Sequence, residues 1–316
     1  MQHTNSHDVA IIGGGLAGLT AAAYIARGGR AVTVYERASH VGGMAATEEA
    51  SGFHFNFGPH AFYLGGVGQE IADDLGIAYP GKTPVADRAL RNGRLHILPV
   101  NARTLLATRL LGAGAKLELG AFLARLPKME TQPLDGVTLN EFLATHLKHE
   151  SSREVLRAVT RVSSYSNDPD HVSAGALLSQ IQGALRGVRY VDGGWQTMVD
   201  SLRANAEAAG ARIVTGAHVA AIERNGRVTG IRMADGEARA ASAVIIAASP
   251  RVAFDLTYRA EETLLGEWAE KATPMRAACL DVALTRLPTP GRPFALGIDS
   301  PTYLSVHSEA AKGLAP

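Results

Sequence analysis

The sequence predicts an α/β protein, and three observations at the start of the chain support this. Residues 9–12 form a short apolar run that ends at three consecutive glycines. Residues 16–27 are rich in Ala and Leu, as in a helix, and residues 31–35 are again apolar and β-branched. Uninterrupted apolar runs are typical of strands buried on both faces of a parallel sheet. We therefore expect a strand–turn–helix–strand unit.

The next segments alternate between strand-like and helical patterns. Residues 53–57 alternate aromatic and polar side chains, which predicts a strand. Residues 100–190 are predicted to form a helical lobe. One helical face there would contain Leu119, Phe122, Leu123 and Leu126, which have helical spacing. Thr138 and Glu141 have the spacing of a capping box at a helix start. Residues 174–185 predict a further helix.

Strands are expected again in the last third of the chain. After a helix over 195–208, the predicted strands are 212–223, 227–233 and 243–248. Asn225-Gly226 predicts the hairpin turn between the first two of these strands. Residues 276–307 resume strand-like patterning.

Composition bounds the class of protein. The chain has 316 residues, of which 46% are hydrophobic and 19% charged. This length suggests about two domains, and this composition excludes a disordered or fibrous chain. The 31 basic and 30 acidic residues nearly cancel, so charge does not favour a nucleic-acid partner. A single cysteine, Cys279, excludes an internal disulfide and a Cys-rich metal site.

The uncharged stretch 9–26 could be mistaken for a membrane span or a signal peptide. Its three consecutive glycines would weaken a helix, and residues 1–8 contain no Lys or Arg for a signal n-region. We therefore expect a cytoplasmic protein.

The glycines Gly13, Gly15 and Gly18 follow the first predicted strand and open the first predicted helix. In this context the first glycine allows a tight turn, the second lets the backbone approach a pyrophosphate, and the third lets helix and strand pack closely. Glu36 closes the second strand, where a carboxylate can accept hydrogen bonds from a ribose. The pattern predicts a dinucleotide site.

The segment DVAIIGGGLAGLTAAAYIARGGRAVTVYERASHVGG resembles the N-terminus of the FAD-dependent amine oxidase, protoporphyrinogen oxidase and phytoene desaturase superfamily, most closely its phytoene desaturase-like branch. FNFGPHAFY, SYSNDPDHVSAGAL, DGGWQTMVDSL and GARIVTGAHVAAIERNGRVTGI extend the resemblance over most of the chain. It implies a Rossmann-like FAD-binding domain from residues 1–75 and 195–255. A mixed helical and sheet substrate domain, from residues 76–194 and 256–316, would be interleaved with it.

The resemblance also implies which residues contact FAD. The glycine turn would hold the pyrophosphate and Glu36 the ribose, while Val219 would touch the adenine through its backbone. Gly43, Met44 and residues 58–60 would line the flavin ring. The full set of expected cofactor-binding residues is Gly13, Gly15, Leu16, Ala17, Gly18, Glu36, Arg37, Gly43, Met44, Gly58, Pro59, His60, Val219 and Ala248. Many relatives have arginine where this chain has Met44, which leaves the electrostatic tuning of the flavin open.

The implied activity is hydride transfer from an apolar or cyclic organic substrate to FAD. No catalytic residue is assigned, because some relatives need no essential protein base. The alternative is a non-catalytic binding protein on the same fold, resembling the escort proteins of prenylated GTPases. Relatives close the flavin site with a later strand–turn–helix that contains a Gly-Asp pair, and this sequence has none. We therefore expect the C-terminal part of the family fold to be missing, or supplied by another chain.

Three further patterns resemble functional motifs, but the residues around them do not support those functions. Residues 76–83 match the phosphate-loop pattern G-x-x-x-x-G-K-[ST], but a helix is predicted before them and Pro84 follows. His146 and His149 have a spacing close to that of metal ligands, but His146 continues an apolar helix face, so no metal site is assigned. Asp170-His171 has no matching nucleophile, because no G-x-S-x-G motif occurs.

Basic residues flank the apolar face of the helical lobe: Arg103, Arg109, Lys116, Arg125 and Lys128. Such a surface can rest on an anionic membrane and draw a lipophilic substrate from it. The other reading, which the sequence favours, is a lobe over the active-site cavity with an ordinary solvated outer face.

Overall fold

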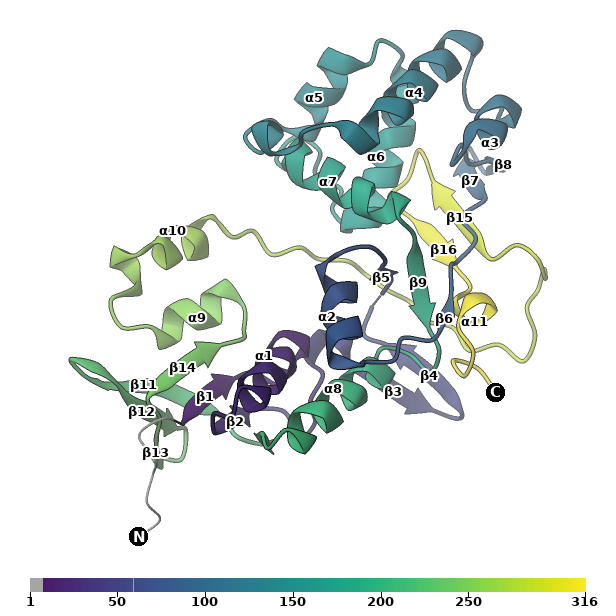
Figure 1. The fold of residues 1–316 in the computed structure, drawn as a ribbon. Helices are drawn as coiled ribbons and strands as arrows, with labels where there is room; N and C mark the ends of the chain where they lie inside the picture. The colour runs from purple at the N-terminus through teal and green to yellow at the C-terminus, as the bar shows by residue number, and fades with distance from the viewer. Residues whose placement is uncertain (1–7, 59) are drawn as a thin grey trace. The chain divides into compact units, whose positions relative to one another are not determined.

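The computed structural model describes residues 8–58 and 60–316 (Figure 1). The chain forms two compact units, each built from three segments. The first comprises Met1–His60, Glu70–Pro80 and Gly193–Pro274, and the second Ala61–Gln69, Gly81–Asp192 and Met275–Pro316. The predicted domains, 1–75 with 195–255 and 76–194 with 256–316, assign cofactor and substrate roles and remain a prediction.

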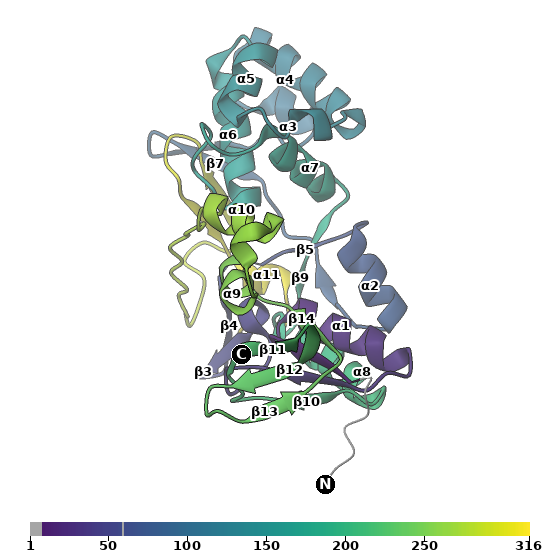
Figure 2. The same ribbon diagram turned by 90° about the vertical axis from the view of Figure 1, so that its left-hand side faces the viewer.

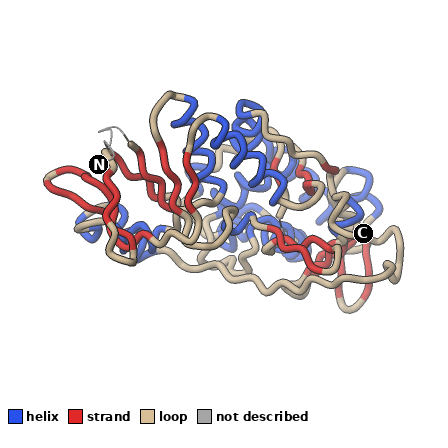
Figure 3. Tube along the Cα trace, turned by 90° about the horizontal axis from the view of Figure 1, so that it is seen from below, coloured by secondary structure: helices blue, strands red, loops and turns tan. Residues whose placement is uncertain are grey.

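A four-stranded parallel sheet forms the centre of the first unit. Its order is β10 (Arg212–Val214), β2 (Val32–Tyr35), β1 (Val9–Ile12) and β14 (Ala243–Ile246), seen as adjacent red segments in Figure 3. All four residues of β1 are buried, as expected for a central strand. Helix α1 (Leu16–Arg27) follows β1 and packs against α8 (Gln196–Ala208). The predicted strand–turn–helix–strand unit is confirmed.

An antiparallel sheet of three strands covers part of this centre. It contains β11 (Val219–Asn225), β12 (Arg227–Met233) and β13 (Ala238–Ala240), and Gly226 takes a φ of 69° in the predicted hairpin turn. Ile231 and Met233 pack with Ala10 and Ile12 in one hydrophobic cluster. The predicted strand 212–223 is divided into β10 and β11, because residues 215–218 turn beside the end of β2.

The remaining elements of the first unit are short. They are the 3₁₀ turn η1 (Gly43–Ala45), the hairpin β3 (Thr47–Ala50) and β4 (Phe53–Asn56), α9 (Pro250–Leu256), η4 (Ala260–Glu262) and α10 (Leu264–Lys271). Strand β4 confirms the strand that the alternating pattern of residues 53–57 predicts. Helix α2 (Val67–Leu75) lies where the chain passes from a segment of the second unit to one of the first.

Five helices of the second unit gather in one group, visible in both Figure 1 and Figure 2. They are α3 (Ala102–Ala107), α4 (Ala113–Arg125), α5 (Leu139–His146), α6 (Glu150–Ser164) and α7 (Ala174–Leu185). Their core includes Leu119, Phe122 and Leu126, three members of the predicted apolar stripe. At the start of α5, the Thr138 hydroxyl accepts from the Glu141 N–H, and the Glu141 carboxylate accepts from the Thr138 N–H at 3.0 Å. The predicted capping box is confirmed.

Two small sheets complete the second unit, together with η2 (Leu126–Lys128), η3 (Gln132–Leu134) and α11 (His307–Ala310). One has the order β5 (Phe62–Tyr63), β9 (Val188–Val191), β6 (Gly81–Lys82). The other has the order β16 (Tyr303–Ser305), β15 (Phe294–Gly297), β7 (Arg88–Arg91), β8 (Arg94–Ile97).

The strand-like pattern of residues 276–307 is only partly realised. Strands form at β15 and β16, but residues 276–293 contain neither helix nor strand and are almost entirely exposed. A strand needs a neighbour for its N–H and C=O groups. No strand in the described part of the chain pairs with residues 276–293, so the prediction is wrong there.

Across residues 8–58 and 60–316, every helix is too short or too polar to cross a membrane.

Candidate cofactor site

Three of the four glycines between the end of β1 and the first turn of α1 are packed against other protein atoms. A Cβ atom on Gly13 would collide with the carbonyl oxygen of Ala247, and one on Gly18 would collide with the carbonyl oxygen of Gly13. A Cβ on Gly14 would lie 2.9 Å from Cγ1 of Val41. These three glycines are therefore required by the close packing of the turn, the helix and the neighbouring strand.

Gly15 differs, because its missing side chain leaves open space. The nearest atom to a Cβ there would be the Gly42 carbonyl oxygen, at 3.8 Å. Gly15 is also the N-cap of α1, with no side chain capping the helix and no acidic residue in its first turn. The first N–H groups of a helix lack intrahelical partners and carry partial positive charge. The turn thus has both the space and the donors that a pyrophosphate requires.

Glu36 is held beside this turn by two backbone N–H groups. Its Oε2 accepts from the Gly14 N–H at 2.6 Å and its Oε1 from the Ala38 N–H at 2.8 Å. Each carboxylate oxygen retains a further lone pair, which can accept from a ribose hydroxyl. The next residue, Arg37, is exposed. The predicted ribose-binding carboxylate therefore lies next to the predicted phosphate turn.

A second turn, residues 42–45, packs against the first. The Gly42 N–H donates to the Gly14 carbonyl at 2.8 Å, and a Cβ on Gly43 would lie 3.6 Å from the Cα of Gly15. Met44 is 74% exposed and so is free to contact a ligand. The structure therefore places the turn that contains Gly43 and Met44 against the glycine turn, and their expected contact with the flavin ring stays a prediction.

His60 supports this second turn from its backbone side. Its Nε2 lies 2.8 Å from the Met44 carbonyl oxygen, and because a carbonyl only accepts, Nε2 is the donor. The imidazole ring also packs on Trp195, with centroids 4.9 Å apart. Gly58 takes a φ of 87°, as a turn glycine does, and Pro59 lies outside the described residues. His60 therefore has the geometry of a residue that fixes the position of Met44.

The last two predicted residues lie near the same strand ends. Val219 is buried at the start of β11, two residues after Ala217, whose N–H donates to the Glu36 carbonyl at 2.8 Å. Ala248 is exposed and follows Ala247, the residue against which Gly13 packs. All predicted cofactor residues in the described part of the chain thus belong to the first unit.

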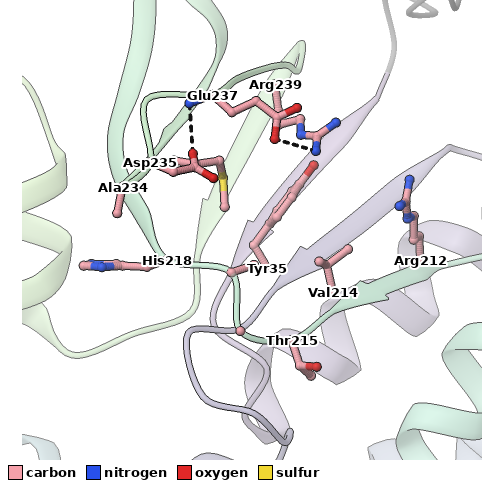
Figure 4. Close-up of a pocket in the computed structure, with 12 residues that line it drawn as sticks. Tyr35, Arg212, Val214, Thr215, His218, Ala234, Asp235, Glu237 and Arg239 are labelled. Atoms are coloured by element: carbon pink, nitrogen blue, oxygen red, sulfur yellow. Dashed lines mark hydrogen bonds and ion pairs between the residues drawn. The ribbon is translucent and has the colours of Figure 1, made fainter.

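A pocket of about 340 Å³ lies at the ends of β2 and β10 (Figure 4). The Tyr35 ring points toward the ion pair of Glu237 and Arg239, whose atoms are 2.7 Å apart. Burial raises the pKa of Tyr35. The lining contains none of the predicted cofactor residues. Its lining comes from β2, β10, β12 and β13 and from the loops 215–218 and 234–237, so only the sheet order, which the sequence does not show, could have revealed it.

The two histidines with a spacing close to that of metal ligands contact other protein groups. His146 Nδ1 lies 2.8 Å from the Phe142 carbonyl oxygen, and its ring stacks on the Phe142 ring. His149 Nδ1 lies 3.1 Å from Glu118 Oε2. Among the described residues, no group of three or more His, Cys, Asp or Glu side chains is placed to hold a metal ion.

Curated proteins similar to this chain include oxidoreductases of two kinds. The "pyridine nucleotide-disulfide oxidoreductase domain-containing protein 2" of mouse is 26% identical over 358 residues, which cover 89% of this chain and 60% of the mouse protein. A carotenoid 3,4-desaturase of Haloarcula japonica is 36% identical over 84 residues, which cover 27% of this chain and 16% of the desaturase. The chain thus spans about 60% of the length of the mouse and rat relatives.

Solved structures show the same fold. An oxidoreductase from Methanosarcina mazei superposes with a TM-score of 0.71 at 20% identity, over 84% of this chain and 66% of that one. A RAB GDI from Plasmodium falciparum superposes less well, with a TM-score of 0.55 at 16% identity, over 76% of this chain and 65% of that one.

The family model for flavin containing amine oxidoreductases matches residues 16–276, which begin at the first residue of α1 and include Gly18, Glu36 and the second turn. The predicted superfamily and the predicted α/β fold are confirmed, and FAD is the cofactor that this family uses. The chain belongs to the family of flavin containing amine oxidoreductases, which are FAD-dependent enzymes.

Proposed function

We propose that the protein is an FAD-dependent oxidoreductase of the desaturase or oxidase type. In this proposal a hydride passes from an apolar or cyclic organic substrate to the flavin. The observation that carries it is the open space at Gly15, next to an uncapped helix start and the fixed carboxylate of Glu36. A glycine turn used only for packing would fill that space with protein atoms, as Gly13 and Gly18 do.

Each residue of the site has a specific part in this function. Residues 15–17 would donate backbone N–H groups to the pyrophosphate, and Glu36 would orient the ribose. His60, through the Met44 carbonyl, would hold residues 43–44 against the flavin ring. Bound FAD supplies the two-electron acceptor. Met44 brings a neutral, polarizable thioether to that position, so the chain adds no positive charge there.

The substrate class is also a proposal. A carotenoid desaturase is among the similar proteins, which supports a lipophilic or cyclic small molecule. Molecules of this kind partition into bilayers, so the proposal extends to peripheral contact with a membrane.

A non-catalytic binding role on the same fold is the second candidate, and the likeness to a RAB GDI favours it. The two functions differ in their need for flavin. The catalytic proposal requires FAD in the glycine turn, whereas an escort role requires only the fold.

A titration of the purified chain with FAD, followed by flavin fluorescence, separates the two. We expect saturable binding, and then loss of the absorbance near ~450 nm when a suitable cyclic or polyene hydrocarbon is added without oxygen. The matched control is Gly15→Val, which we expect to fold normally and to bind no FAD. If wild type binds FAD no better than Gly15→Val, and a prenylated GTPase binds without flavin, the escort role replaces the catalytic proposal.

A further inference from the structure

Helix α4 has two apolar faces, and only one of them is covered. Its buried face packs into the helical core through Ala115, Leu119 and Phe122. A second set of apolar residues, spaced four, four and three apart, lies on the exposed side: Ala113, Leu117, Ala121 and Ala124. The outer face of a solvated helix normally carries polar side chains. This face is therefore not an ordinary solvated surface.

Helix α3 extends the exposed apolar face. Lys116 Nζ donates to the Leu106 carbonyl at 2.6 Å, which fixes the end of α3 beside α4. A Cβ on Gly120 would lie 3.1 Å from Cδ2 of Leu105, so the two helices pack closely. The two largest residues of the face, Leu106 and Leu117, are 74% and 78% exposed. We call these two leucines and the three exposed alanines Ala113, Ala121 and Ala124 the α3–α4 surface.

The segment that carries the α3–α4 surface is rich in cations. Within residues 101–128 these are Arg103, Arg109, Lys116, Arg125 and Lys128, against a single acid, Glu118. In the described part of the chain, the side chains of Arg103, Arg109 and Lys128 have no hydrogen-bond or ion-pair partner. A chain with a net charge of +1 thus concentrates unpaired positive charge in the segment that carries this exposed apolar surface.

Glu118 does not neutralise these cations, because it is engaged by the start of α6. It accepts from the backbone N–H groups of Lys148, at 2.5 Å, and His149, at 3.1 Å. Burial raises its pKa, but these hydrogen bonds outweigh burial and lower the pKa to about 2. Its side chain is 15% exposed. The acid therefore faces the core side of α4.

We propose that the α3–α4 surface docks on an anionic lipid bilayer. Leu106 and Leu117 would enter the boundary between headgroups and acyl chains, and the surrounding Arg and Lys side chains would bind lipid phosphates. A second copy of the chain would bring the same cations to the same place, and like charges would repel it. A soluble polyanion would leave both leucines exposed to water. Charge and apolar area together therefore fit a membrane.

This inference deepens the membrane contact of the proposed function. Sedimentation with lipid vesicles tests it without flavin or substrate, so its failure would leave the proposed hydride transfer, which the FAD titration tests, unaffected. The wild-type chain should bind vesicles containing phosphatidylserine and phosphatidylcholine, and should bind pure phosphatidylcholine vesicles much less. Each Lys or Arg near an anionic surface changes partitioning about fivefold. The triple variant R103E/R109E/K128E should therefore lose binding by at least ~100-fold.

Two further variants make the test specific. R227E/R276E/R286E changes the net charge equally at exposed arginines elsewhere, and should bind far better than the first triple variant. L106S/L117S keeps every charge and should weaken binding at least ~10-fold, because it removes the inserted apolar groups.

Three results would overturn the inference. One is equal loss in the two triple variants, and another is no loss in L106S/L117S. The third is concentration-dependent dimerisation in light scattering that the leucine changes abolish, because the surface would then bind a second copy.

Discussion

Two glycine-rich segments of this chain match sequence patterns of phosphate-binding loops, and they fold differently. Residues 13–18 follow strand β1 and open helix α1. Residues 76–83 follow helix α2 and run into strand β6. Phosphate binding by such loops depends on a strand before the glycines and a helix after them. The order of elements, which residues 76–83 reverse, separates the two segments more clearly than the glycine spacing does.

The glycines themselves also differ in what surrounds them. A Cβ on Gly15 would have no protein atom outside its own chain neighbours closer than 3.8 Å. Gly81 has a φ of 146°, and a Cβ there would collide with the carbonyl oxygen of Tyr190 on β9. The first is open for a ligand, whereas the second is required for a strand pair. A glycine that binds and a glycine that packs can thus be told apart by the atoms around them.

The largest expected effect is that of Gly18→Ala. The added methyl group would meet the Gly13 backbone, so α1 and β1 would have to separate, at a cost of about 3 kcal/mol in the free energy of unfolding. Urea unfolding measures this. Gly136→Ala is the control, because no atom lies within 4 Å of a Cβ there. Equal stability of the two variants would show that Gly18 is not a packing glycine.

Gly15→Val should act on binding and not on folding. The β-branched side chain would fill the space reserved for the pyrophosphate, and we expect FAD affinity to fall at least ~100-fold. The free energy of unfolding should change by less than about 1 kcal/mol, because the site is open. The measurements are fluorescence titration with FAD and urea unfolding. Normal flavin content in this variant would refute the placement of the phosphate site.

Glu36→Ala should have a smaller effect on the same site. It removes a charged acceptor for the ribose, which weakens FAD binding by about 1–3 kcal/mol. It also leaves the Gly14 N–H without its carboxylate partner. Glu36→Gln, which keeps one acceptor oxygen, should fall between wild type and Glu36→Ala in a titration with FAD. An unchanged dissociation constant in both variants would mean that the ribose is held elsewhere.

The smallest expected effect is that of Lys82→Ala. Lys82 is exposed on a two-residue strand, so stability should change by no more than about 0.5 kcal/mol. Neither the variant nor wild type should bind ATP in a calorimetric titration. If wild type binds ATP and Lys82→Ala does not, residues 76–83 are a nucleotide site, and the order of elements does not distinguish the two segments.

Local signals in the sequence were sufficient to predict the glycine turn between β1 and α1. Gly13 and Gly18 are required by close packing that the preceding strand and following helix already imply, whereas a ligand role for Gly15 stays a prediction. The position of Glu36 beside the turn could also be predicted, because only one helix and one strand separate it from the glycines. The Thr138–Glu141 capping box is equally local, since both partners lie within one helical turn.

Features that depend on distant partners could not be predicted. The pattern of residues 276–293 suggests a strand but does not specify a neighbour, and none is present among the described residues. Helical spacing identified the buried face of α4, yet it did not show that Leu117 on the other side stays uncovered. The contact of His60 with the Met44 carbonyl joins two turns whose approach depends on tertiary structure.

The pairing of β1 with β14 has a consequence during protein synthesis. Val9 lies opposite Ala243 in the sheet, so β1 cannot pair with β14 until most of the chain has been translated. At about 5–20 residues per second this delay is on the order of 10–50 s. Throughout it, one edge of β1 is unpaired and Gly13 lacks the Ala247 backbone against which it packs. The packing of the glycine turn is therefore completed late in the synthesis of the chain.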